Sequence, residues 1–246
     1  RSLFVSKWQR GALLSAVGLG PEANEFDINT LVDDLGLVAG DAIPTSACDV
    51  VWVSPRDPAA CAYLSSPLRG LKELLEVWPM IRRIHTDATL HLYYGWETTP
   101  AQIYGAHREA AMHRIAQLAP QGVVWHGRRP QVELEAVLPT MGVWLYPAVF
   151  PEGYCMSGVR ATAAGLVPCY RRIAAMEECQ IPSLYSVPDT DWRQGGAAQF
   201  TAAALASLET SKANTWDREG ARGWARSKTW PMVATAIVSD IERRKT

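Results

Sequence analysis

The segment at positions 150–168 contains the residues whose types and spacing first suggest chemistry. An apolar run at 142–147 precedes it, Glu152 and Gly153 form a turn, and small residues favour a helix from about Tyr154. The first N–H groups of such a helix have no partner within the helix, and they face the carboxyl end of the preceding strand. Backbone groups in this arrangement bind phosphate without any special side chain. We therefore expect a diphosphate to bind at this turn.

A repeating strand and helix pattern surrounds this turn. Short apolar runs rich in β-branched and aromatic residues are followed by helix-like sequence at 50–54, 88–95, 122–126, 142–147 and 166–170. The clearest helix follows residue 70, and Pro79 should kink it or mark its last turns. The alternation predicts an α/β protein with a Rossmann-like, doubly wound parallel sheet and helices on both faces. A helical C-terminus is expected at 199–212, 216–228 and 231–244.

The first 40 residues differ from the rest of the chain. Positions 1–19 combine a short apolar run with a helix-like pattern, and positions 20–45 are acidic and rich in proline and glycine. We expect a remnant of a preceding domain plus a linker at 1–40, and one Rossmann-like domain with C-terminal helices at 41–246. The chain begins Arg-Ser-Leu-Phe, which is typical of a piece of a longer or processed protein.

Composition excludes several functional classes. The 246 residues carry a formal net charge of -1, so electrostatic capture of nucleic acid is not expected. No apolar run approaches the roughly 20 residues that a membrane span needs. The five cysteines are odd in number and lie in or beside apolar segments, which favours reduced packing residues in a cytoplasmic protein.

Metal and cofactor motifs are weak. Asp189-Thr190-Asp191 matches the Asp-x-Asp of metal-dependent GT-A glycosyltransferases, but it follows Pro188 in a polar segment that favours a solvated loop. The sequence contains no Walker phosphate loop, Gly-x-Gly-x-x-Gly turn or nucleophile elbow, and the histidines lack metalloprotease spacing. We expect no metal and no cofactor, and the kinase, hydrolase and epimerase classes are not supported.

The segment around Glu152 resembles the donor-binding segment of the retaining family-four glycosyltransferases of GT-B fold. The flanking Leu-Tyr-Pro, Tyr-Cys-Met-Ser and Ala-Ala-Gly-Leu-Val-Pro strings also match that family. The resemblance implies that this domain is one half of a GT-B fold, that Glu152 contacts hydroxyls of a donor sugar, and that backbone N–H groups bind sugar and phosphate at Gly153, Tyr154, Cys155 and Met156. The structural alternative is that Glu152 only caps its helix, and the two roles can coexist.

A second string, Ser-Ser-Pro-Leu-Arg-Gly-Leu-Lys at 65–72, resembles the family segment between the first strand and first helix. It implies that Arg69 binds the donor phosphates and, with Glu152, serves catalysis, and that Lys72 belongs to the donor site. A guanidinium suits this role because it can bind phosphate oxygens in a fork and stabilise a leaving diphosphate. The alternative is a surface arginine at a helix start.

A third string, His-Gly-Arg-Arg at 126–129, is similar to the family turn beside the nucleotide base. It implies donor contacts at Gly127 and Arg128, and the absent side chain of Gly127 would allow close backbone approach. His126 by itself is typical of a hydrogen-bonded structural histidine.

Arg160 departs from the family pattern. Eight positions after Glu152 the family has a carboxylate that accepts hydrogen bonds from the ribose hydroxyls, whereas arginine has donors only. Loss of such a charged partner costs about 1.5–3 kcal/mol. Either Arg160 turns to a phosphate or to Glu152 and donor affinity is weakened, or the site has lost its chemistry.

The resemblance implies a nucleotide-sugar-binding domain that transfers a sugar from a UDP- or GDP-sugar to a hydroxyl acceptor with retention. Such an active site lies between two domains, so we expect the chain to be incomplete alone and to require an acceptor-side domain or a homo-oligomer. The alternative is a non-catalytic Rossmann-like binding or assembly module whose donor site has decayed.

Overall fold

A six-stranded parallel sheet forms the centre of the protein. The computed structural model describes residues 7–16, 48, 56–96 and 101–243. Within them the strand order is β3-β2-β1-β4-β5-β6. Strands β2 and β3 add on one side of β1, and the chain then crosses to the other side of β1, where β4 pairs parallel to it. The strands are β1 (Asp57–Tyr63), β2 (Thr89–Leu92), β3 (Val123–Trp125), β4 (Met141–Tyr146), β5 (Val167–Arg171) and β6 (Tyr185–Val187).

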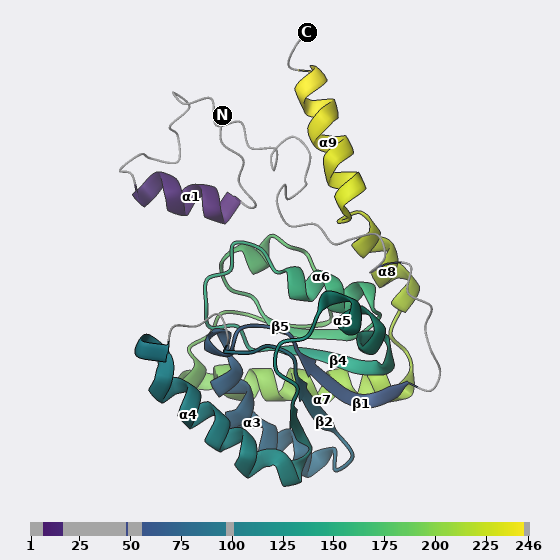
Figure 1. Ribbon diagram of the computed structural model, residues 1–246. Helices are drawn as coiled ribbons and strands as arrows, with labels where there is room; N and C mark the ends of the chain where they lie inside the picture. The colour runs from purple at the N-terminus through teal and green to yellow at the C-terminus, as the bar shows by residue number, and fades with distance from the viewer. Residues whose placement is uncertain (1–6, 17–47, 49–55, 97–100, 244–246) are drawn as a thin grey trace.

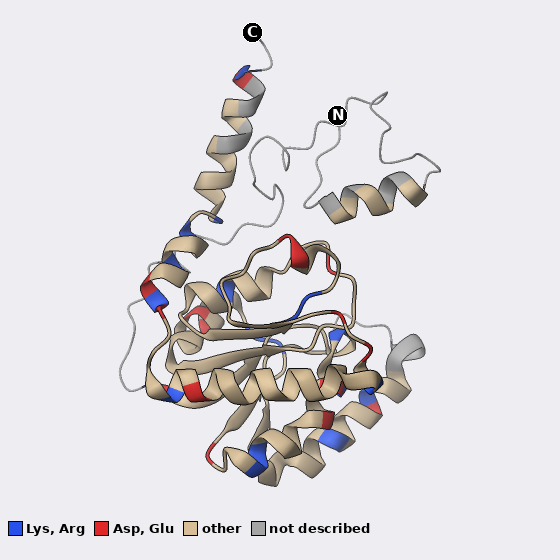
Figure 2. Cartoon of the chain, turned by 180° about the vertical axis from the view of Figure 1, so that it is seen from behind, with Lys and Arg blue, Asp and Glu red and all other residues tan. Residues whose placement is uncertain are grey.

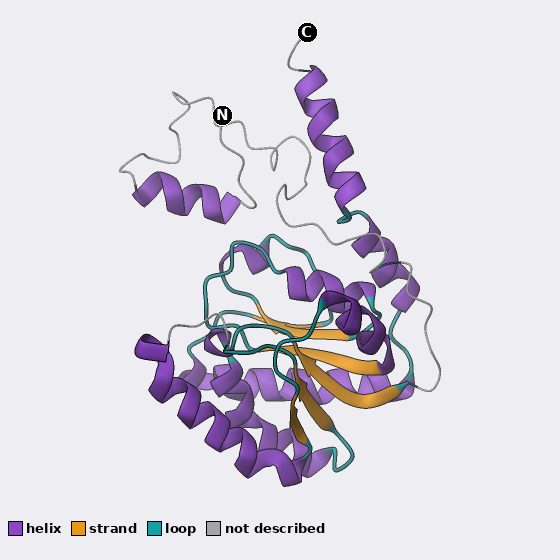
Figure 3. Cartoon of the chain, viewed as in Figure 1, coloured by secondary structure: helices purple, strands orange, loops and turns teal. Residues whose placement is uncertain are grey.

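Helices cover both faces of this sheet (Figures 1 and 3). Helices α3, α4 and α7 lie on one face, α5 and α6 lie on the other, and α8 packs on α6. The bounds are α1 (Lys7–Ala16), α3 (Leu71–Ile84), α4 (Ala101–Leu118), α5 (Gln131–Val137), α6 (Met156–Ala163), α7 (Ala197–Ala213), α8 (Arg218–Arg226) and α9 (Trp230–Arg243). The expected α/β class, a Rossmann-like sheet with helices on both faces, is confirmed.

The central strands are apolar because they are covered on both sides. Every residue of β4 is buried, and α3 buries the face that includes Leu74, Trp78 and Ile81. Burying side chains of this size contributes roughly 1.5–3 kcal/mol each. Gly158 lets α6 lie close to this core, since a Cβ there would stand 2.9 Å from the Trp144 ring.

Helix α7 braces the start of the central strands. The Ser211 hydroxyl near its end donates to the Pro58 carbonyl over 2.8 Å. The Arg56 guanidinium donates to Ser211 (3.2 Å) and to the Met141 carbonyl (2.7 Å). These bonds join the amino ends of β1 and β4 to the C-terminal helices.

The outer helices differ in how they meet the domain. In α1, the backbone N–H of Trp8 donates to the Glu178 carboxylate over 2.7 Å. Helix α9 projects away from the sheet (Figure 1), and Trp230, Met232 and Val238 along it are each about half exposed. The predicted boundary near residue 40 lies outside the described residues.

Most predicted elements have the expected type, with two differences. The predicted strand at 50–54 lies outside the described residues, and the first described strand is β1, in sequence that the prediction left as a connection. Strand β6 was not predicted. Helix α3 continues past Pro79 to Ile84, and the three C-terminal helices lie where the sequence indicates.

Side-chain chemistry on the surface and in the core is unexceptional. All five cysteines are buried as thiols, as the sequence predicts. Seen from behind, basic and acidic residues are interspersed over the helices (Figure 2).

No helix in the described ranges is long and apolar enough to cross a membrane. Within the same ranges, no three His, Cys, Asp or Glu side chains gather closely enough to hold a metal ion.

Candidate functional site

Two loops meet at the carboxyl ends of β1 and β4, where the strand order reverses. Parallel sheets hold ligands at this position, because the loops after the two neighbouring strands diverge there. Gly70 ends the first loop with a φ of 126°, and a Cβ on it would stand 2.4 Å from the Pro147 carbonyl oxygen. Only glycine permits both the conformation and the contact. The close approach brings the 65–70 loop against the residues that follow β4.

Arg69 and Glu152 face each other across these loops. Arg69 Nη1 donates to Glu152 Oε2 over 2.9 Å and to Oε1 over 3.1 Å. The Glu152 side chain is 6% exposed and that of Arg69 is 40% exposed. The pair thus combines a carboxylate buried in the domain with a guanidinium that reaches solvent.

Tyr146 holds the other side of the carboxylate. It is the last residue of β4, and its hydroxyl donates to Glu152 Oε1 while accepting from the Ser65 hydroxyl over 3.4 Å. Burial, followed by the neighbouring Cys155 and Glu152, raises the pKa of Tyr146 well above its usual range, so the phenol remains a donor. The Arg69 guanidinium also lies 4.6 Å from the centre of the Phe150 ring. These contacts fix both charged groups before any ligand arrives.

A cavity of about 280 Å³ opens beside this network. It is lined by the two loops, by the segment that follows β2, by α5 and its continuation, and by the start of α6. Serine and tyrosine hydroxyls, two guanidinium groups and one carboxylate lie among apolar side chains in its walls. The lining residues are Leu64, Ser65, Ser66, Arg69, Tyr94, Leu134, Leu138, Glu152, Tyr154, Cys155, Met156, Ser157 and Arg160.

Helix α6 begins at the edge of this cavity. It starts at Met156, two residues later than the sequence suggests, and Cys155 occupies the N-cap position without a side-chain cap. Glu152 does not cap the helix, because its carboxylate is bound by Arg69 and Tyr146 instead. Burial raises the pKa of Cys155 to about 12, so its thiol is not a nucleophile near neutral pH. Gly153 lies in the turn before the helix but does not line the cavity.

Arg160 lines the cavity from α6. Its Nη2 donates to the side-chain oxygen of Gln131 on α5 over 2.9 Å. The Glu152 carboxylate, to which Arg160 was expected to turn as one alternative, accepts hydrogen bonds from Arg69 and Tyr146. Gln131 was not predicted to take part in the site.

The third predicted segment lies apart from this cavity. Gly127 adopts a φ of 69° after β3, Arg128 is exposed, and neither lines the cavity. The His126 ring stacks on Tyr93 with 4.4 Å between centroids and lies 2.9 Å from His91 through ring nitrogens. Burial lowers the pKa of both histidines, which suits neutral rings that share a hydrogen bond. The interpretation of His126 as a hydrogen-bonded structural histidine agrees with this geometry.

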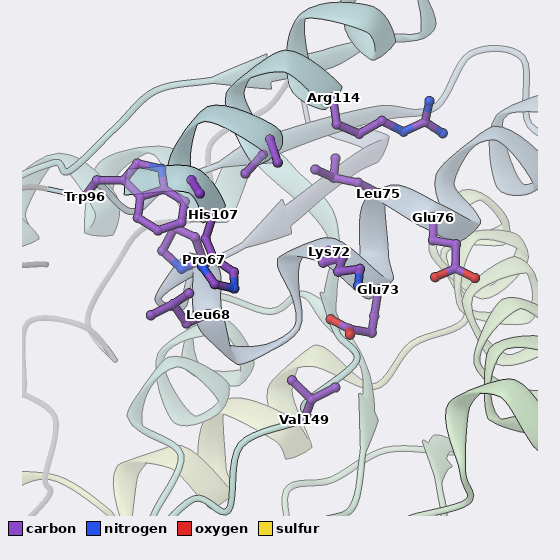
Figure 4. Close-up of a pocket in the computed structure, with 13 residues that line it drawn as sticks. Pro67, Leu68, Lys72, Glu73, Leu75, Glu76, Trp96, His107, Arg114 and Val149 are labelled. Carbon is purple, nitrogen blue, oxygen red and sulfur yellow. The ribbon is translucent and has the colours of Figure 1, made fainter. Parts of the chain in front are cut away.

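Lys72 lies on a second, larger cavity between α3 and α4 (Figure 4). This cavity has a volume of about 700 Å³ and mostly apolar walls, with Trp96 and His107 at one end and Arg114 at the other. Residues 67–69, between the two cavities, form a short 3₁₀ turn. The structure therefore does not bring Lys72 into one cavity with Arg69.

The sequence missed the residues that organise the site. Tyr146 and Ser65 orient Glu152, and Gln131 binds Arg160, yet none of them was proposed as a site residue. One signal was present for Tyr146, since it ends the strand that leads directly into the Glu152 turn. No pattern singles out Gln131, whose role depends on how α5 packs beside α6.

The fold is an α/β domain of the kind that forms one half of GT-B glycosyltransferases. No protein-family model and no curated protein sequence matches the chain. Solved structures do: a glycosyltransferase from Rickettsia africae has a TM-score of 0.71 at 13% identity, covering 98% of this chain and 62% of that one. The pneumococcal O-GlcNAc transferase GtfA, in complex with UDP and GlcNAc, has a TM-score of 0.67 at 12% identity, with coverages of 98% and 44%.

A sucrose-phosphate synthase from Thermosynechococcus elongatus is similar at the same level, with a TM-score of 0.67, 15% identity, and coverages of 99% and 57%. The chain therefore spans about half the length of these glycosyltransferases. At such identities the likeness establishes the fold. The expectation that the chain has the architecture of a GT-B half-domain is confirmed, whereas the retaining family-four assignment stays a prediction.

Proposed function

We propose that this chain is the donor-binding domain of a retaining glycosyltransferase of the family-four type. The observation that carries the proposal is the Arg69–Glu152 pair beside a cavity at the switch point of the sheet. A nucleotide bound there would place its diphosphate between Arg69 and the first N–H groups of α6.

Arg69 is suited to hold the diphosphate without leaving Glu152. Both hydrogen bonds between the two side chains use Nη1, so Nη2 and Nε can turn toward a phosphate on the exposed side. As the bond from sugar to phosphate breaks, charge grows on the leaving diphosphate, and a guanidinium already in place stabilises it. Glu152, held by Tyr146 and Arg69, would accept hydrogen bonds from hydroxyls of the donor sugar.

We propose a UDP-sugar as the first donor to test and a GDP-sugar as the second. The solved glycosyltransferase GtfA holds UDP and GlcNAc, which supports a uridine nucleotide. Retention follows in our proposal from attack by the acceptor hydroxyl on the same face as the departing phosphate. The bond from sugar to phosphate breaks as the new bond forms, and the leaving phosphate takes the hydroxyl proton, so this domain needs no separate base. We further propose a cytoplasmic location, since five buried thiols suit a reducing compartment.

Transfer requires a second domain in this proposal. The chain spans 44% of the length of GtfA, and the boundary that we place near residue 40 leaves little of an acceptor-side domain. We propose that such a domain, or a second copy of this chain, covers the cavity during transfer. Donor binding is therefore the property to measure first.

Isothermal titration of UDP, GDP and their glucose and N-acetylglucosamine conjugates tests the proposal. We expect saturable binding of one diphosphate, and a loss of about ten-fold or more in affinity in Arg69→Ala, because a charged hydrogen-bond partner is removed. Arg108→Ala serves as the matched control, since Arg108 is exposed on α4 and lines neither cavity. Equal affinity in the two variants would overturn the role of Arg69.

A second candidate is a non-catalytic binding or assembly module with a decayed donor site. Arg160 favours it, because the guanidinium is tied to Gln131 where a ribose-binding carboxylate would stand. This candidate predicts that none of the diphosphates binds, even in Arg160→Glu. Binding that appears or tightens in that variant would favour the glycosyltransferase.

A further inference from the structure

An exposed aromatic side chain lies against the cationic group of the candidate site. Phe150 follows the buried strand β4 by four positions, yet the residue is 45% exposed. The Arg69 guanidinium lies over its ring, 4.6 Å from the ring centre. The face of an aromatic ring carries partial negative charge, so it attracts a cation placed over it. The ring and the guanidinium therefore form a cation–π pair at the solvent side of the Arg69–Glu152 network.

The backbone on both sides of Phe150 fixes the position of this ring. On one side, the carbonyl of buried Ala148 accepts a hydrogen bond from the Arg171 guanidinium over 3.1 Å. On the other side, the Glu152 carbonyl accepts one from the backbone N–H of Ala175 over 3.1 Å. The ring is thus carried by an anchored segment, although its own side chain is only partly packed.

The backbone next to Arg69 is locked to the same segment. Gly70 follows Arg69, and a Cβ at Gly70 would stand 2.4 Å from the Pro147 carbonyl oxygen. Such close backbone contact leaves the two loops little freedom to shift relative to each other. The loops therefore set Arg69 over the Phe150 ring before any ligand binds.

The hydrogen bonds to Glu152 do not by themselves orient the Arg69 guanidinium. Both start from Nη1, at 2.9 Å to Oε2 and 3.1 Å to Oε1. A planar group that is held at one nitrogen can still turn about that contact. The Phe150 ring is the second contact to this side chain, and a flat ring face limits the plane in which the guanidinium lies. It thereby limits the directions in which Nε and Nη2 point.

We propose that Phe150 is a positioning residue for the donor diphosphate. Its ring fixes the guanidinium plane, so that Nε and Nη2 of Arg69 meet two phosphate oxygens together as a fork. Without the ring, Arg69 would supply a positive charge but not a fixed pair of donors. The inference rests on the proposed function, since it takes Arg69 as the group that meets the diphosphate.

The ratio of affinities for UDP and UMP tests this role. The two nucleotides differ by one phosphate, so the ratio isolates the part of the affinity that the second phosphate adds, and GDP with GMP repeats the comparison on another base. Calorimetry supplies the dissociation constants. Phe150→Leu keeps an apolar side chain without a ring, and it should lower the ratio about two- to five-fold, the range for an exposed cation–π contact. Phe150→Tyr keeps the ring face and should keep the ratio.

Two further variants separate positioning from a general effect of losing an exposed ring. Trp230→Leu removes a half-exposed ring from α9 and should leave the ratio unchanged. Arg69→Met removes the guanidinium, and Phe150→Leu added to that variant should change the ratio no further. Urea unfolding checks that every variant is folded.

Three results would overturn the positioning role. They are an unchanged ratio in Phe150→Leu, a fall of the same size in Phe150→Tyr, and an effect of Phe150→Leu that persists in the Arg69→Met variant. Each would mean that the ring does not act through the guanidinium.

The same titrations distinguish this inference from the proposed function. If UDP or GDP binds and requires Arg69 while Phe150→Leu has no effect, the positioning proposal alone fails. If the Phe150 and Arg69 variants alter diphosphate binding but no nucleotide sugar binds, the glycosyltransferase proposal fails and the positioning role stands. Absence of binding by every nucleotide overturns both.

Discussion

Replacing Arg69 with methionine should destabilise the domain even in the absence of ligand. The substitution keeps an aliphatic stem but leaves the Glu152 carboxylate, whose side chain is 6% exposed, with Tyr146 as its remaining side-chain donor. Removing one partner of a fully buried ion pair costs about 3–5 kcal/mol. Because the Arg69 side chain is 40% exposed, solvent compensates part of that loss, and we expect about 2 kcal/mol.

Urea unfolding followed by tryptophan fluorescence measures this effect. In a thermal unfolding experiment, the same loss of about 2 kcal/mol corresponds to a fall in Tm of roughly 4–8 °C for a domain of this size. The double variant Arg69→Met/Glu152→Gln should recover part of the loss, since the carboxylate is removed along with its partner. The double-mutant cycle compares the natural chain, the two single variants and the double variant. It should yield a coupling energy of about 1–2 kcal/mol between Arg69 and Glu152.

The surface pair Arg129–Glu133 is the matched control. Its atoms lie 3.6 Å apart at an i,i+4 spacing and both side chains are about half exposed, so its coupling should not exceed about 0.5 kcal/mol. If the Arg69–Glu152 coupling is no larger than that of the surface pair, the buried network does not fix the site and our account of its pre-organisation is wrong.

Three further substitutions test other parts of the structure. Gly70→Ala should cost about 2 kcal/mol or more in unfolding free energy, because φ is positive and the new Cβ meets a carbonyl at 2.4 Å, whereas Gly223→Ala, with open space around it, should be neutral or stabilising. Tyr146→Phe should lower stability by about 1.5–3 kcal/mol by removing a donor to the Glu152 carboxylate, and urea midpoints unchanged from those of the natural chain would contradict this. The lowered pKa of His126 means that the unfolded chain binds more protons at this site below pH 6.5, so stability falls as pH drops through that range. His126→Gln should make the urea midpoint less sensitive to pH between about 6.5 and 5, and an unaltered pH slope would argue against a neutral ring.

Local sequence was sufficient to predict most of the sheet because its strands are apolar on both faces. It failed at β1, where the residues Asp-Pro-Ala-Ala-Cys-Ala-Tyr are small and less apolar than the valine-rich run at 50–54, yet are buried beside β4. It also failed at β6, which has only the residues Tyr-Ser-Val and no alternation long enough to recognise.

The candidate site was predicted in part. Six predicted residues line the cavity, namely Arg69, Glu152, Tyr154, Cys155, Met156 and Arg160, whereas Lys72, Gly127, Arg128 and Gly153 do not. Arg69 and Glu152 were both expected to contact a donor, and the ion pair between them arises because β1 and β4 are neighbours at the switch point. The bond from Arg160 to Gln131 likewise joins helices on one face of the sheet. Such contacts depend on which strands are neighbours in the finished sheet, and local sequence patterns do not encode this spatial order.

That strand order also has a consequence for the protein during its synthesis. Strand β1 pairs with β4 through contacts such as Cys61 with Val143, which are 82 positions apart (143 minus 61). At about 5–20 residues per second, a ribosome needs roughly 4–16 s to make that interval. Over this time β2 and β3 can pair on one side of β1, while its other edge, with unsatisfied backbone N–H and C=O groups, has no partner. The same adjacency that creates the candidate site in the finished domain therefore leaves the nascent chain with an open central edge, which is a template for pairing with another chain.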